Sequence, residues 1–442
     1  MIRALRASPL AYFAVAYGAA AALQKGLGFV LFLWLAHSLS VRDYATFGLL
    51  YALQMGLAAL LGAGIVESVI GLMRERSSFH LRGGVLDAAN RVFALLAVPS
   101  ITIVAAIYVL FMRDAGTPHY VLALVIVAGV LTAFFTLQSS IIRLDEQHGA
   151  SLALSFFSPL GGLAGGAVGF ALGANVASFF AGSAIGLVVT SFLLAGLRLG
   201  FYGFAAKRAD MTGILSRILP FIFIAALGWL GGYGNTYLVE SFFTASDVAK
   251  FTFAYTLSSV LQLVATSLNQ VWSPRFYRMA HTQPPQEVEP ANRRFFAFQG
   301  AAIGLAGGCI LVLLPGAIDH VGGNLVAYRR INLELLILFA AYAVSIPAWQ
   351  SQNYFYAFNK GKDLMHVTLV GSVAGLILWV LAALTLGTIG AYVGFMMQML
   401  TRSVTAIIRA RREWGIRVAW EGPALAMLLL IAGAAASAAI YR

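Results

Sequence analysis

The sequence predicts an all-α polytopic membrane protein, with two pseudo-symmetric six-helix lobes around a central cavity and an extra C-terminal helix. Three observations lead to this fold class. First, the 442 residues are 60% hydrophobic and only 10% charged, whereas soluble domains carry roughly 25% charged residues. Second, apolar runs of about twenty residues or more recur along the whole chain, and each is long enough to cross a hydrocarbon core of roughly 30 Å as a helix. Third, the chain repeats itself.

The apolar runs and the polar stretches between them define the predicted segments. An N-terminal lobe, residues 1–200, takes the runs at 10–38, 44–73, 86–112, 119–143, 150–173 and 177–198. A polar stretch at 201–217 is predicted to be a cytoplasmic linker. A C-terminal lobe, residues 218–412, takes the runs at 218–243, 248–279, 295–318, 331–357, 364–387 and 389–411. A further run at 419–440 predicts an additional membrane segment within residues 413–442.

The first run is predicted to be a retained helix. It is longer than the apolar core of a signal peptide and lacks a small-residue cleavage site.

Basic residues gather in alternate connections, which places those connections in the cytoplasm by the positive-inside rule. They comprise Arg3, Arg6, Arg74, Arg76, Arg82, Lys207, Arg208, Arg217, Arg293, Arg294, Lys360, Lys362, Arg409, Arg411, Arg412 and Arg417. The opposite connections are poorer in cations, with Arg329 and Arg330 as the main exception. The chain is therefore predicted to be a multi-pass protein with its amino terminus inside. Its net charge of +12 is better explained by this topology than by nucleic-acid binding.

Composition also argues against enzymatic chemistry. Cys309 is the one cysteine, so it excludes an internal disulfide and a cysteine-based metal cluster. The sequence shows neither a phosphate-binding glycine loop nor a metal-ligand pattern. We therefore expect no enzyme activity, no cofactor and no metal.

Two pairs of similar segments indicate an internal duplication. DYATFGLLY begins at Asp43 and DVAKFTFAY at Asp247, an offset of 204 residues. LGANVA from Leu172 and LGTIGA from Leu386 each join the fifth and sixth segments of a half. Because each unit has an even number of crossings, both copies have the same orientation, and the axis relating them is expected to run along the membrane normal.

Polar residues inside the apolar runs are the candidate site. Counting 1.5 Å per helical residue places Lys25 roughly 20 Å from the outer surface. It places Arg91, Arg402, Gln262 and Glu67 roughly 10 Å from the inner surface. Ionisable groups in the bilayer are costly and usually face a partner or a water-filled cavity. If these helices converge, the layer is net positive and suits an anionic ligand, because the guanidinium fork matches phosphate oxygens. In the alternative interpretation Lys25 pairs with Glu67, while the arginines extend to the inner surface.

Three stretches resemble the bacterial polysaccharide transporter family. The stretch at residues 25–70, which begins KGLGFVLFLWLAHSLSVRDYATFGLLY, is similar to the family's first two helices. Residues 219–279, with the Leu227-Gly228-Trp229 turn and the closing NQVWSPRFY, follow its seventh and eighth helices. GSVAGLILWVLAALTLGTIGAYVG at 371–394 resembles its eleventh and twelfth.

This resemblance implies a fold like that of the multidrug and toxin extruders of the same exporter superfamily. It also implies transport of a polyprenyl-pyrophosphate-linked oligosaccharide across the bacterial inner membrane, with Lys25 as the family's basic residue in the first helix. Two departures are visible. Asn235 and Thr236 stand where the family commonly has an acidic residue, and the predicted segments are odd in number, whereas members mostly have an even number.

The working hypothesis is an alternating-access flippase that moves this lipid-linked oligosaccharide, an O-antigen, capsule or exopolysaccharide precursor, from the cytoplasmic to the outer leaflet. Lys25, Arg91, Arg402 and Gln262 would bind substrate, and Glu67 would act in coupling to a Na+ or H+ gradient or in charge tuning. Membrane lipids and a polysaccharide polymerase are the expected partners. The alternatives are a cation-coupled multidrug exporter of the same fold, a lipid-II-type flippase for cell-wall precursor, and a membrane scaffold without transport activity.

Overall fold

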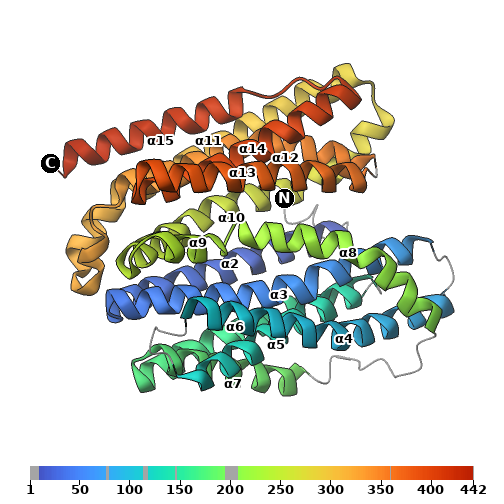
Figure 1. The fold of residues 1–442 in the computed structure, drawn as a ribbon. Helices are drawn as coiled ribbons and strands as arrows, with labels where there is room; N and C mark the ends of the chain where they lie inside the picture. The colour runs from blue at the N-terminus through green and yellow to red at the C-terminus, as the bar shows by residue number, and fades with distance from the viewer. Residues whose placement is uncertain are drawn as a thin grey trace. The chain divides into compact units, whose positions relative to one another are not determined.

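The computed structural model describes residues 9–75, 79–112, 118–144, 147–194, 208–358 and 360–441. These residues form α-helices, one 3₁₀ helix and short connections (Figure 1). In this part of the chain, 11 helices are long and apolar enough to cross a membrane. The all-α membrane fold expected from the apolar runs is therefore confirmed.

The chain packs as two compact units. Unit 1 contains the described residues up to Leu31 and Thr46–Ser241, and unit 2 contains Phe32–Ala45 and the described residues from Phe242 onward. Unit 1 is built from α2 (Pro9–Ser38), α3 (Val41–Glu75), α4 (Phe79–Met112), α5 (His119–Leu144), α6 (His148–Gly173), α7 (Val176–Leu194), α8 (Arg208–Leu230) and α9 (Asn235–Phe242). Unit 2 is built from α10 (Ala245–Thr282), α11 (Pro285–Val321), η2 (Gly323–Tyr328), α12 (Asn332–Ala357), α13 (Gly361–Leu386), α14 (Thr388–Trp414) and α15 (Glu421–Ile440).

Most helices match the predicted segments to within a few residues, but α4 begins at Phe79 and α11 at Pro285, before the predicted starts at 86 and 295. Two further differences concern the seventh predicted run and the linker before it. The run predicted at 218–243 is divided, because a turn at residues 231–234 separates α8 from α9. The run contains three glycines at this turn, Gly231, Gly232 and Gly234, and glycine weakens a helix interior. Residues 208–217 of the predicted linker form the first turns of α8, and residues 201–207 lie outside the described part of the chain.

The compact units and the predicted lobes divide the chain at different places. The predicted lobes follow the sequence repeat and separate at the linker, whereas α8 and most of α9 pack with unit 1. Residues 32–45, which comprise the last residues of α2, the connection and the first residues of α3, pack with unit 2. The extra C-terminal segment is present as α15, which packs along α11.

The helix starts at the two repeated segments have the same local structure. Ser40 precedes α3, and its hydroxyl accepts a hydrogen bond from the amide of Asp43 (3.1 Å) and donates to the Asp43 carboxylate (2.6 Å). Thr244 and Asp247 form the equivalent side-chain pair at the start of α10, where the Thr244 backbone amide also donates to the Asp247 carboxylate. Each pair satisfies amide groups that the first helical turn leaves without a partner.

Aromatic contacts repeat at the same offset of 204 residues. Phe47 stacks on Tyr51 with 5.8 Å between ring centroids, and Phe251 stacks on Tyr255 with 6.1 Å. The weak sequence similarity therefore corresponds to a repeated structure.

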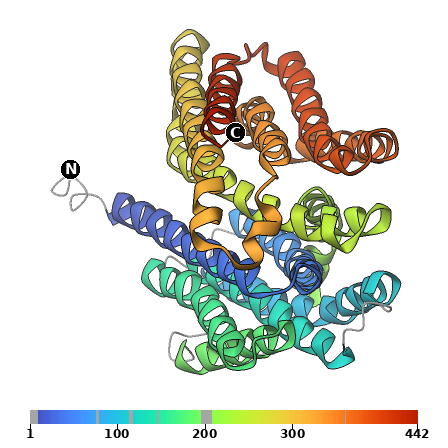
Figure 2. The same ribbon diagram turned by 90° about the vertical axis from the view of Figure 1, so that its left-hand side faces the viewer.

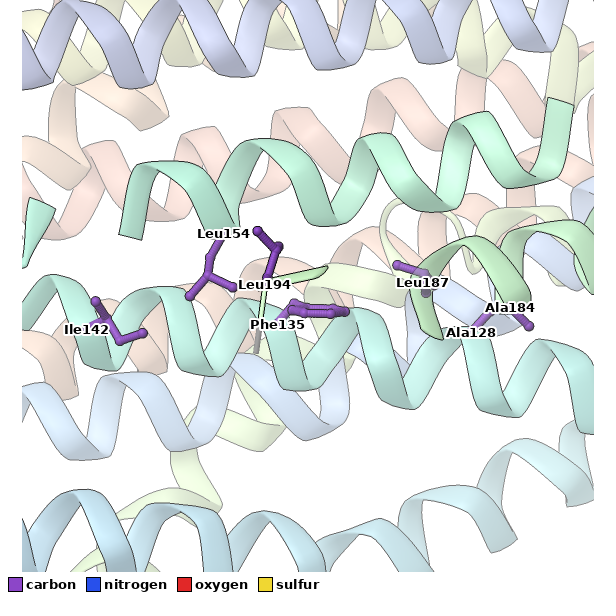
Figure 3. Packing of buried hydrophobic residues seen from close by; sticks show 7 residues of the cluster. All are labelled: Ala128, Phe135, Ile142, Leu154, Ala184, Leu187 and Leu194. Atoms are coloured by element: carbon purple, nitrogen blue, oxygen red, sulfur yellow. The ribbon is translucent and has the colours of Figure 1, made fainter. Parts of the chain in front are cut away.

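A second block of each half repeats its core positions at an offset of 213 residues. In unit 1, α5, α6 and α7 enclose a buried cluster that includes Phe135, Ile142 and Leu154 (Figure 3). In unit 2 the positions 213 residues later are Ala348, Phe355 and Val367, which belong to a buried cluster of α12, α13 and α14. The side chains differ in size, but the same positions are buried in both copies. Cores tolerate such changes as long as the hydrophobic pattern is kept.

The offset grows from 204 to 213, so the second copy carries nine additional residues between its two blocks. Part of this addition lies between α11 and α12. That connection runs from Gly322 to Ile331 and contains η2, whereas residues 113–118 connect α4 to α5. Figure 2 views the end of unit 2 at which η2 lies.

Helices α6 and α7 approach each other through glycine. A Cβ atom added to Gly165 would collide with the carbonyl oxygen of Gly182, and one added to Gly169 would collide with that of Ser178. Gly161 and Gly186 form a third contact of this kind one turn away. Such spacing of small residues is typical of close helix pairs in membranes.

Candidate functional site

Lys25 lies in the middle of α2 with an exposed side chain. Its apolar neighbours Leu23 and Leu27 are also exposed, by 53% and 44%. Among the described residues, Lys25 forms neither a hydrogen bond nor an ion pair. One turn later Gly28 packs against Leu163 of α6, which fixes this part of α2 in unit 1. The structure thus presents an ammonium group in an apolar helix.

Arg91 lies on α4 beside a polar contact between helices. The amide of Gln138 on α5 donates a 2.7 Å hydrogen bond to Asn90. Gln138 is fully buried, and Asp87 on the same helix as Arg91 is 6% exposed. One side-chain oxygen of Asp87 and the amide oxygen of Gln138 are buried without a hydrogen-bond partner among the described groups. Arg91 is therefore half-buried next to amide and carboxylate groups, not in a purely apolar layer.

Glu67 belongs to α3, but its side chain lies outside the described part of the chain. The alternative pair of Lys25 with Glu67 therefore lies outside the described residues as well.

Arg402 on α14 is held against α13. Its Nε donates a 2.9 Å hydrogen bond to the hydroxyl of Ser372. The two helices come close because Gly371 and Gly375 face the backbone of Arg402 and Gln398, where a larger residue would collide. The guanidinium group is thus oriented by a neighbouring helix, and α14 itself is not among the 11 described helices that are apolar enough to cross a membrane.

Gln262 and Arg402 follow two ring contacts between α10 and α14 at equal distances along their helices. Phe251 contacts Tyr392 and Tyr255 contacts Phe395, with ring centroids 5.5 and 5.8 Å apart, so α10 and α14 run in parallel. Gln262 follows Tyr255 by seven residues, and Arg402 follows Phe395 by seven. Seven residues are about two helical turns, so both side chains return to nearly the same face of their helices.

A second polar group lies further along α10. Asn353 of α12 donates to the amide oxygen of Asn269 (3.0 Å) and accepts from the hydroxyl of Ser273 (3.0 Å). Asn353 is 1% exposed. This group and Gln262 give the C-terminal half of α10 a polar face.

The predicted layer is thus built from two described halves. Unit 1 carries Lys25 and Arg91, and unit 2 carries Gln262 and Arg402. Whether the four side chains meet in one chamber stays a prediction.

Sequence reasoning missed several polar residues next to the predicted ones. They are Asp87, Asn90, Gln138, Asn269, Asn353 and Ser372. The available signal was a carboxylate or amide inside an apolar run, which is as unusual as a charge there.

Two clusters of charge lie at opposite ends of unit 2. A pocket of about 560 Å³ at one end is lined by Glu289, Arg293, Arg294, Arg417 and Glu421. In this pocket Arg293 forms an ion pair with Glu421. A pocket of about 360 Å³ at the other end lies between η2 and the first turns of α10 and α12. Within the described residues, no group of three His, Cys, Asp or Glu side chains is arranged to hold a metal ion.

Solved structures with the same fold are transport proteins. A multidrug resistance MATE family transporter of the MOP superfamily, in an inward-facing conformation, is 14% identical with a TM-score of 0.69, over 90% of this chain and 98% of that chain. The lipid II flippase MurJ, in an inward closed conformation, is 12% identical with a TM-score of 0.71, over 97% of this chain and 93% of that chain. The Vibrio cholerae MATE transporter VcmN is 12% identical with a TM-score of 0.59, over 91% and 95%. At these identities the likeness shows the fold.

The sequence itself places the chain in a family. No curated protein matches it. The model of the family described as polysaccharide biosynthesis protein matches residues 14–280, which is more than half of the chain. This matched region includes Lys25, Arg91 and Gln262. The chain has the multi-helix fold of these membrane transport proteins, and it belongs to the polysaccharide biosynthesis protein family.

Proposed function

We propose that the protein flips a polyprenyl-pyrophosphate-linked oligosaccharide from the cytoplasmic to the outer leaflet of the bacterial inner membrane, with its amino terminus in the cytoplasm. The product would be a precursor of O-antigen, capsule or exopolysaccharide. Family membership supports the pathway, and the exporter fold supports transport. The observation that carries the proposal is Lys25, an exposed ammonium in an apolar helix without an ion pair among the described residues. A diphosphate would supply the negative charge that offsets its cost in the membrane.

Each residue of the proposed site has its own role. Lys25, Arg91 and Arg402 bind the diphosphate oxygens, and the hydrogen bond from Arg402 to Ser372 fixes the direction of its guanidinium fork. Gln262 hydrogen-bonds the diphosphate or the first sugar. Glu67 adjusts the charge of the site or couples it to a Na+ or H+ gradient. The polyprenyl chain stays in lipid while the headgroup crosses between the lobes.

The charge of these residues separates the proposal from a cation-coupled multidrug exporter. A pump for cationic compounds needs carboxylates at its substrate site, whereas the candidate residues here are three cations, an amide and one carboxylate. A lipid-II-type flippase shares the anionic ligand and is distinguished by the sugar it accepts. A polysaccharide polymerase that acts on the flipped product is the expected partner.

The test uses the full chain reconstituted in liposomes that contain a polyprenyl-diphosphate-linked oligosaccharide. Flipping is read as the loss or gain of access to a lectin outside the liposome. We expect Lys25→Ala and Arg402→Ala to lower the rate by at least about tenfold, the loss of one to two charge-assisted contacts. Lys25→Arg should keep part of the rate. Arg412→Ala, which removes an exposed cation near the end of α14, is the matched control and should leave the rate unchanged.

Parallel liposomes with lipid II or with a cationic dye test the alternatives. Flipping of lipid II in preference to the oligosaccharide would establish the lipid-II alternative. Dye transport that survives Lys25→Ala, without any lipid flipping, would replace the proposal with a multidrug exporter.

A further inference from the structure

The pocket beside η2 concentrates positive charge where membrane topology does not require it. Its lining includes Lys250 from α10, Arg329 and Arg330 from the end of η2, and Glu334 from α12. We call it the η2 pocket. In unit 2 the other described basic clusters lie at the end of α10, the start of α11, the start of α13 and the end of α14, which the positive-inside rule assigns to the cytoplasm. Arg293 and η2 are separated by nearly the whole of α11, roughly 40 Å. The η2 pocket therefore lies at the opposite, outer end.

One of its three cations is already neutralised. Arg329 forms a two-pronged pair with Asp319, with its Nε 2.7 Å from one carboxylate oxygen and its Nη2 2.9 Å from the other. Lys250 and Arg330 form no ion pair among the described residues, and Glu334 is the remaining carboxylate of the lining. Two cations thus face one carboxylate, which leaves the pocket with an excess of positive charge.

The pocket wall is held in place by buried contacts. Tyr328, the last residue of η2, is fully buried and stacks on Phe253 of α10 with 4.5 Å between ring centroids. Its other neighbour is Tyr44, which is 5.9 Å away. His37 contacts the carbonyl oxygen of Gly322 at 3.2 Å, at the point where the chain enters η2 with a φ of 69°. A segment fixed in this way presents Arg329 and Arg330 at constant positions, which reduces the entropy lost on binding.

An exposed apolar side chain lines the same pocket, and two others lie near it in the sequence. Val326 lines it and is 54% exposed, and Val321 and Leu333, close by in the chain, are 53% and 55% exposed. A site for a free inorganic anion does not need such a border, whereas a lipid with a charged headgroup does.

We infer that the η2 pocket binds the phosphate group of an amphipathic lipid at the outer face of the membrane. Lys250 and Arg330 pair with the phosphate oxygens, and the hydrocarbon part extends past Val326 into the bilayer. The site is built partly on the connection between α11 and α12, which is longer than the connection between α4 and α5.

Two lipids share this chemistry. One is the diphosphate headgroup of the transported lipid after it has crossed, and this choice rests on the proposed function. The other is a resident anionic phospholipid, which does not depend on it. The phosphate is common to both, and the experiment separates them.

The single cysteine makes a local test possible. In a Cys309→Ala background, Val326→Cys places a thiol in the pocket and Asn324→Cys places one on exposed η2 outside its lining. The full-length protein in liposomes is labelled with a membrane-impermeant maleimide. The competitors are farnesyl diphosphate, dihexanoyl phosphatidylglycerol, farnesol and inorganic pyrophosphate.

A phosphate-bearing lipid at about ten times its dissociation constant should slow the labelling of Val326→Cys about tenfold and leave Asn324→Cys unchanged. Protection by farnesyl diphosphate alone assigns the transported lipid, and protection by phosphatidylglycerol assigns the resident one. Adding Lys250→Ala and Arg330→Ala should reduce the protection to less than about twofold. Arg42→Ala, which removes an exposed cation at the start of α3, should keep it.

The inference is overturned if neither lipid protects, if farnesol or pyrophosphate protects equally well, or if the double variant protects like the parent. Size-exclusion profiles in detergent show whether each variant is folded. The variant Lys25→Ala, added to Val326→Cys, separates this inference from the proposed function. If the lipid still protects the thiol while flipping is lost, both proposals are supported. If the protein with Lys25 flips normally but the lipid does not protect Val326→Cys, only the η2 pocket inference fails.

Discussion

Trp229 of α8 donates its indole N–H to the backbone carbonyl oxygen of Ala52 on α3, at 2.8 Å. Two turns of chain later, Tyr237 of α9 donates its hydroxyl to the carbonyl oxygen of Leu49 at 2.7 Å. The divided helix is thus tied to α3 on both sides of its break. At the offset of 204 residues, Trp229 occupies the position that Lys25 holds in the first copy. One copy uses this position for an anchoring aromatic residue and the other for a charge.

The anchor predicts a measurable loss of stability. Trp229→Phe keeps most of the ring but removes the donor, and we expect the free energy of unfolding to fall by about 1 to 2 kcal/mol. Thermal unfolding of the purified protein in detergent measures this. Trp420→Phe changes an indole that is 61% exposed and should have little effect. Equal stability of the two variants would contradict a role for the contact with Ala52.

The repeated caps predict two equal effects at distant positions. Ser40→Ala and Thr244→Ala each remove the side-chain half of a helix cap, so each should destabilise the protein by about 1 kcal/mol. Ser246→Ala alters an exposed hydroxyl in the first turn of α10 and serves as the control in the same melting experiment. A large difference between the two losses of stability would show that the caps of α3 and α10 do not contribute equally.

The glycine contact between α6 and α7 predicts that a glycine-to-alanine substitution destabilises the protein at the contact and does not do so away from it. Gly165→Ala places a methyl group on the backbone of Gly182 and should destabilise the protein by about 2 kcal/mol, within the range seen for overpacking. Gly149→Ala, in the first turn of α6, meets open space and should be neutral or slightly stabilising because alanine favours the helix. Melting temperatures of the two variants, measured side by side, test this contrast.

Ser372 should act on transport through Arg402. Ser372→Ala removes the acceptor that orients the guanidinium group, and under the proposed function we expect flipping to slow about fivefold, the equivalent of one hydrogen bond of about 1 kcal/mol. Ser372→Thr keeps a hydroxyl and should retain more of the rate. The liposome assay measures the rate, and a melting temperature near that of the parent separates orientation from misfolding. Flipping that is unaffected by Ser372→Ala would remove the positioning role.

Sequence was sufficient for the fold because the bilayer imposes a length and a composition on each helix. It indicated Lys25 and Arg402 for the same reason, since a charge in an apolar run is conspicuous. It did not reveal the break before Asn235. The sequence is apolar on both sides of the glycines there, so it predicts one continuous helix. Nor did it reveal the contact of Asn90 with Gln138 or of Asn269 with Asn353, because each contact depends on how two separate helices pack. The η2 pocket had one trace in the sequence, the two arginines that depart from the charge pattern.

The interlocked backbones of α6 and α7 have a mechanical consequence. Where carbonyl oxygens meet glycine Cα atoms, no side chain is present to rotate and absorb a displacement. The hairpin should therefore transmit force as a stiff lever instead of sliding on itself. Strain from a moving substrate would then be relieved at softer points of the same unit, and the glycine-rich turn at residues 231–234 is such a point.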